Sequence, residues 1–61
     1  MSFSVGDRVH YIGSNAKILT DYGNQELEII ALDVKTRRVV CQTVRLAQQV
    51  VGIAFEDLSK L

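Results

Sequence analysis

Few side chains in this 61-residue sequence are of the types that carry out chemistry in proteins. Cys41 is the only cysteine and His10 the only histidine, so no Cys/His cluster has the spacing of metal ligands. No nucleophile has an evident base and orienting partner, and the scattered glycines form no phosphate-binding loop. Cys41 is expected to be a small buried apolar residue, and His10 a solvated strand residue. We therefore predict no catalytic residue, no metal ligand and no cofactor.

The charged residues balance, with seven Lys and Arg against seven Asp and Glu and a pI of about 6.5. Domains that bind nucleic acid usually carry net positive charge, because phosphate contacts supply much of their affinity. A local patch would be enough, and Tyr22 could stack on a base beside Lys17. The candidates for contact with a ligand or nucleic acid are Arg8, Lys17, Tyr22, Arg37 and Arg38. Nucleic acid is thus the alternative partner, and a protein or a second copy is favoured.

The composition predicts one folded domain over residues 1–61. Apolar residues make up 48% of the chain, and the mean hydropathy is +0.13. This is high for a domain of this size, which buries only about 60% of the surface that its unfolded chain exposes. No apolar run is long enough to span a bilayer and no signal peptide is evident, so we expect a cytoplasmic protein without a membrane partner.

Alternation of apolar and polar residues predicts a mostly β structure. Turn-forming clusters, such as Gly13-Ser14-Asn15 and Asp21-Tyr22-Gly23-Asn24, separate the alternating runs. Residues 14–25 are expected to form a long ordered loop, anchored by Ile18 and Leu19. The expected elements are strands over residues 8–12, 27–32, 38–46 and 50–55, a bulge or bend at Gly52, and a helical turn over residues 56–58.

A helix over residues 38–61 is the alternative, and it would give an α+β fold. Apolar residues in this segment also follow three- and four-residue spacing, as on one stripe of an amphipathic helix. They are Val40, Val44, Ala47, Val51, Phe55, Leu58 and Leu61. The many β-branched residues and the central Gly52 favour strands instead.

The order of these features resembles small SH3-like barrels of about five strands. Val5-Gly6-Asp7-Arg8-Val9 matches the way such barrels open, a central hairpin follows, and Phe55-Glu56-Asp57-Leu58 ends the chain in a helical turn. Similar modules are KOW and Tudor-like domains, barrel subunits of photosynthetic complexes, and type II dihydrofolate reductases. The resemblance implies binding of nucleic acid or protein, or an enzyme whose site forms only in an oligomer. The Val-Gln-Ile-Tyr stretch of the reductases is replaced here by Val50-Val51-Gly52-Ile53.

Both faces of the predicted central hairpin are apolar. Leu27, Ile29 and Ala31 share one face with Val39 and Cys41, and this face is expected to point into the core. The opposite face carries Ile30, Leu32, Val40 and Val44, which we predict to form an interface. Contiguous apolar surface usually marks an interaction site. The leading hypothesis is therefore a non-catalytic binding or adaptor domain that contacts another protein or itself.

Overall fold

The computed structural model describes residues 2–61 and contains a single antiparallel sheet of five strands. The elements in chain order are β1 (Arg8–Tyr11), α1 (Ala16–Tyr22), β2 (Leu27–Asp33), β3 (Arg38–Thr43), β4 (Gln49–Ala54), the 3-10 helix η1 (Phe55–Asp57) and β5 (Leu58–Lys60). In the sheet the order is β4-β3-β2-β1-β5. The predicted all-β fold of five strands with a C-terminal helical turn is confirmed, and the alternative helix over residues 38–61 is wrong.

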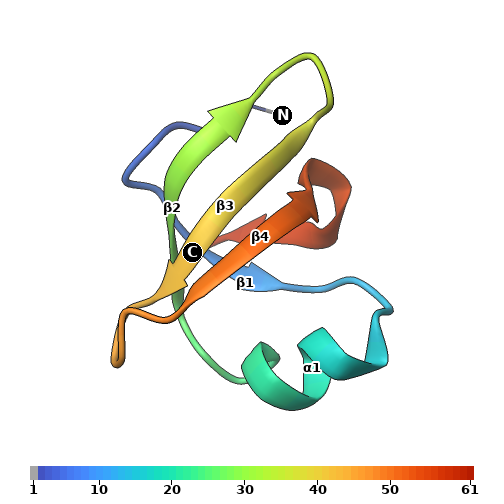
Figure 1. Ribbon diagram of the computed structural model, residues 1–61, viewed down its shortest axis with the longest axis vertical. Helices are drawn as coiled ribbons and strands as arrows, with labels where there is room; N and C mark the ends of the chain where they lie inside the picture. Colours follow the sequence, from blue (N-terminus) through green and yellow to red (C-terminus); the bar gives the residue numbers. More distant parts are fainter. Residues whose placement is uncertain (1) are drawn as a thin grey trace.

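The sheet coils around the core but does not close into a barrel. Figure 1 shows β1 crossing behind β3 and β4 at a steep angle, so successive strands are strongly rotated. Strands β4 and β5 are the two edges, and no ladder joins them within residues 2–61. The described helices include none with the length and apolar character needed to cross a membrane.

Each strand sends its alternate side chains into one core. The buried apolar residues are Phe3, Val9, Tyr11, Leu27, Ile29, Val39, Cys41, Val50, Ile53 and Leu58. Thr43 is the one buried polar residue in the described chain, and its hydroxyl accepts a hydrogen bond of 3.0 Å from the amide of Gln48. Because this hydroxyl has a partner, its burial carries no uncompensated desolvation cost.

The prediction of a long loop over residues 14–25 is wrong for residues 16–22, which form helix α1. The side chain of Asn15 caps this helix, with Oδ1 accepting hydrogen bonds from the amides of Lys17 and Ile18. Ile18 and Tyr22 lie four residues apart, on one side of the helix, and both pack against the core. Leu19 was expected to help anchor this segment, but it is exposed.

Two irregularities interrupt the pairing of the strands. Between β3 and β4, Val39 pairs with Ile53 and Val40 pairs with Val51, so Gly52 is an extra residue without a partner. Its φ is 78°. This confirms the predicted bulge, because glycine adopts a left-handed conformation without a Cβ clash. In β2 the register shifts between Ile29 and Ala31, and the bulge leaves Ile30 without a partner in β3.

Candidate functional site

An uncharged band crosses the outer face of the sheet over β2, β3 and β4. Val40 lies at its centre, with Ala31 of β2 and Val51 of β4 as its direct partners across the strands. Ile30 adjoins Ala31 at the bulge of β2. We call these four residues, Ile30, Ala31, Val40 and Val51, the apolar band. Ala31 is exposed, Val51 is 73% exposed, and Ile30 and Val40 are half-buried. The band therefore leaves apolar surface in contact with solvent.

Polar rows border the apolar band on both sides. One row runs across the four strands from Arg8 through Glu28 and Gln42 to Gln49. The other contains Asp33 and its cross-strand partner Arg38. An apolar centre with a polar rim is the usual anatomy of a protein-binding surface.

A shallow open hollow of about 250 Å³ lies over the band beside Arg38. Its lining includes Ala31, Val40, Val51 and the backbone of Gly52. The Arg38 guanidinium donates a 2.9 Å hydrogen bond from Nη1 to the Gly52 carbonyl. This bond holds the arginine along the wall of the hollow, so the hollow has an apolar floor and one charged side.

Two of the predicted interface residues belong to the apolar band, and two do not. Ile30 and Val40 lie in it, as expected from the alternation. Leu32 was expected on the outer face, but it packs against the core and pairs with the buried Val39. The β2 bulge causes this difference, because an extra residue reverses which side chains face inward. Val44 is 40% exposed and follows Thr43, beyond the polar row of Gln42.

Two residues of the apolar band, Ala31 and Val51, were not among the predicted interface residues. Ala31 was expected in the core with Leu27 and Ile29, and the register shift turns it outward. Val51 is directly opposite Val40, and its exposure follows from simple alternation with the buried Val50. The exposure of Val51 could therefore be predicted from the sequence, whereas that of Ala31 could not.

The candidate residues for nucleic-acid contact do not form one patch among the described residues. Arg8 donates a 2.7 Å hydrogen bond to Glu26, and this bond raises the pKa of Arg8 above its usual value. Arg8 also lies 3.9 Å from Glu28. Lys17 is exposed on α1, whereas Tyr22 is half-buried against the core. These cationic and aromatic side chains therefore have different neighbours and do not gather on one surface.

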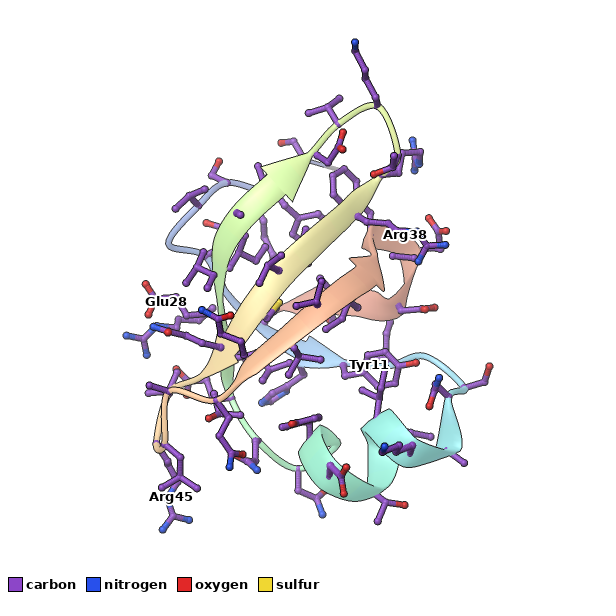
Figure 2. All side chains as sticks on the ribbon, in the orientation of Figure 1. Tyr11, Glu28, Arg38 and Arg45 are labelled. Atoms are coloured by element: carbon purple, nitrogen blue, oxygen red, sulfur yellow. The ribbon has the colours of Figure 1, made fainter. Side chains whose placement is uncertain are left out.

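Two further cations, Arg37 and Arg38, leave the β2–β3 turn in different directions. The Arg37 guanidinium lies over the Phe55 ring, 5.8 Å from its centroid, and 3.9 Å from the carboxylate of Glu56. Arg38 instead faces Gly52. Figure 2 shows Arg38, at the start of β3, well separated from Arg45, in the turn that follows β3, so these positive charges do not gather on one surface.

A second, aromatic hollow of about 300 Å³ lies between η1 and the N-terminal segment. Phe3 and Phe55 line it, with ring centroids 5.6 Å apart and planes inclined by 60°. Ile12, which is 60% exposed, forms part of its rim. Charged side chains of Arg37 and Glu56 face each other there, so the hollow offers an aromatic floor but no net charge.

The structure places Cys41 inside the core and His10 on the exposed face of β1. Burial raises the pKa of the Cys41 thiol to about 11, so it remains protonated and unreactive at neutral pH. Residues 2–61 contain no cluster of three or more His, Cys, Asp or Glu side chains that could hold a metal ion. His10 is exposed on β1, paired across the strands with Ser59.

Comparisons with protein-family models, with curated proteins and with solved structures each found no match.

Proposed function

We propose that this chain is a non-catalytic binding module that uses the apolar band to contact another protein. The observation that carries the proposal is the band itself: uncharged side chains in register on three adjacent strands, with Ala31 and Val51 exposed. Helix α1 packs against the core through Ile18 and Tyr22 and leaves these residues uncovered. Burial of such a surface against a partner is favourable by about 25 cal/mol per Å².

The charges favour a protein partner over nucleic acid. The chain has no net charge, and Arg8 is already paired with Glu26 at 2.7 Å. Release of counterions by unpaired Lys and Arg is the main source of non-specific affinity for nucleic acid. The single buried thiol of Cys41 accords with a reducing, cytoplasmic setting, which we include in the proposal.

Site-specific photo-crosslinking tests this function in the cells that make the protein. A photoreactive amino acid at Ala31 probes the band, and one at Val34 serves as the matched control. Both positions are exposed, but Val34 lies in the β2–β3 turn outside the band. The proposal predicts a discrete protein adduct from position 31 that is absent from position 34. Equal adducts from both positions, or none from position 31, would contradict it.

A second pair of variants tests whether the contact is apolar. Ala31→Lys places a charge in the band, and Val34→Lys places the same charge in the turn. Removing one buried apolar contact and desolvating a charge in an interface costs about 2 kcal/mol or more. We therefore expect Ala31→Lys to abolish the adduct, with the photoreactive group moved to Val40, while Val34→Lys leaves it intact.

A further inference from the structure

Strand β4 has an unpaired edge whose free backbone groups can be assigned. The amide of Thr43 donates to the carbonyl of Gln48 at 2.9 Å, at the start of the β3–β4 ladder. In an antiparallel ladder, residues alternate between those bonded to the neighbouring strand and those directed away from it. Val50, which pairs with Cys41, is therefore bonded to β3, and Gln49 and Val51 direct their N–H and C=O groups away from the sheet.

This edge lacks the features that usually prevent a strand from pairing with another chain. Natural edges are protected by charges, by prolines, by bulges or by being very short. Strand β5, the other edge, has three residues and ends in Lys60. Strand β4 has six residues and no charged side chain or proline. Its bulge at Gly52 lies beyond Val51, so the segment from Gln49 to Val51 remains regular.

We propose that β4 pairs in antiparallel orientation with β4 of a second copy of this chain, around a two-fold axis at Val50. In this register Gln49 of one copy is opposite Val51 of the other, so every free backbone group of these two residues gains a partner. Both residues also face outward from the sheet, and the two Val50 side chains both face the cores. The segment is therefore its own complement, as a two-fold interface requires.

The register also follows from the position of the bulge. Centring the axis on Val51 instead would place the outward-facing Gln49 opposite the inward-facing Ile53, because Gly52 reverses the alternation. The Gly52 carbonyl is already bonded to Arg38, which ends the usable edge at Val51. A chain with no net charge does not repel its own copy.

This pairing extends the sheet sideways and does not cover its outer face. Ala31 lies two strands from the β4 edge, so it stays available to a different protein. The proposed dimer uses the backbone edge of β4, whereas the proposed binding module uses outward-facing side chains on β2, β3 and β4, and only Val51 belongs to both. Either proposal can therefore fail without the other.

The test compares two lysine variants in the same polar row. Gln49→Lys adds a charge on the β4 edge, and Gln42→Lys adds it one strand inward, directly opposite Gln49. Sedimentation equilibrium of the purified chain, up to about 1 mM, is expected to show twice the monomer mass of 6.8 kDa. We expect Gln49→Lys to weaken the association about tenfold or more, and Gln42→Lys to leave it unchanged.

Hydrogen exchange of individual amides by NMR identifies the contact. Exchange of the Gln49 and Val51 amides is expected to slow as the concentration rises, while that of the exposed turn amide of Val34 does not change. A chain that stays monomeric at about 1 mM would overturn the proposal, and would leave the edge open to a strand of another protein. A dimer whose Gln49 and Val51 amides exchange as in the monomer would also overturn it.

Discussion

Replacing Ala47 by glycine should stabilise the fold, although the substitution removes a side-chain carbon. Ala47 adopts φ of 55° in the turn between β3 and β4, a left-handed conformation. Its amide donates to the Thr43 carbonyl at 2.8 Å, so the turn holds this conformation. An L-residue with a Cβ loses about 1–2 kcal/mol there, and glycine does not. The methyl group itself is exposed, and little packing is lost.

The unfolded state reduces this gain but does not reverse it. Glycine makes the unfolded chain more flexible, which costs about 0.5–1 kcal/mol relative to alanine. Taking the middle of both ranges, Ala47→Gly is predicted to raise the free energy of unfolding by about 0.5–1 kcal/mol. In a domain of this size that corresponds to a Tm increase of about 2–8 °C.

Urea unfolding followed by circular dichroism measures the effect, with Ala16→Gly as the control. Ala16 is also exposed, but it opens α1 with an ordinary helical backbone, so its replacement should destabilise the fold by up to about 1 kcal/mol. Opposite signs for the two variants are the expected result, with similar m-values. Equal destabilisation by both would refute the argument, because Ala47 would then carry no conformational strain.

Substitutions at three other residues test separate features of the structure. Thr43→Val leaves the Gln48 amide without its buried acceptor and should cost about 1–3 kcal/mol by urea unfolding, whereas Thr43→Ser should keep most of that stability. Arg37→Gly relieves a left-handed backbone at φ of 57° but loses the contact with the Phe55 ring, so its net gain should be smaller than that of Ala47→Gly; an equal gain would show that the ring contact contributes nothing. Cys41 should make the stability of the fold depend on alkaline pH. Its pKa in the folded protein, about 11, exceeds the usual 9.0, so the thiol of the unfolded chain ionises first as the pH rises. The free energy of unfolding should therefore fall by about 1–2 kcal/mol between these two pH values. Cys41→Val should remove that part of the pH dependence, and an unchanged slope in this variant would contradict the assignment.

The alternation of side chains was sufficient to predict β1, β2, β3 and β4, because each of them packs one face on the core. Strand β5 was not among the expected strands. The pattern around Val39 and Cys41 places both residues inside, as the structure does. Gly52 was also readable as a bulge, since only glycine takes its left-handed backbone without strain.

Features that depend on tertiary packing could not be predicted from the alternation of side chains. The bulge at Ile30 has no glycine to mark it, and it exchanges the faces of Ala31 and Leu32, so only part of the candidate surface was predicted. Helix α1 has seven residues, a length at which helices are marginal without packing. Asn15 is a suitable cap, but Ile18 stands where a capping box would have an acidic residue or Gln, so the start signal is incomplete.

The position of β1 between β2 and β5 has a kinetic consequence. Strands β2, β3 and β4 follow one another along the chain and can assemble through short turns. The pairing of Val9 with Lys60 instead joins residues from opposite ends of the sequence, and its loop must close before the contact contributes any free energy. We expect this closure to limit the folding rate, since rates fall as contacts become more distant in sequence. A shortened or tethered chain that keeps β2, β3 and β4 but prevents β5 from reaching β1 should therefore collapse quickly yet never acquire the cooperative unfolding of the whole domain.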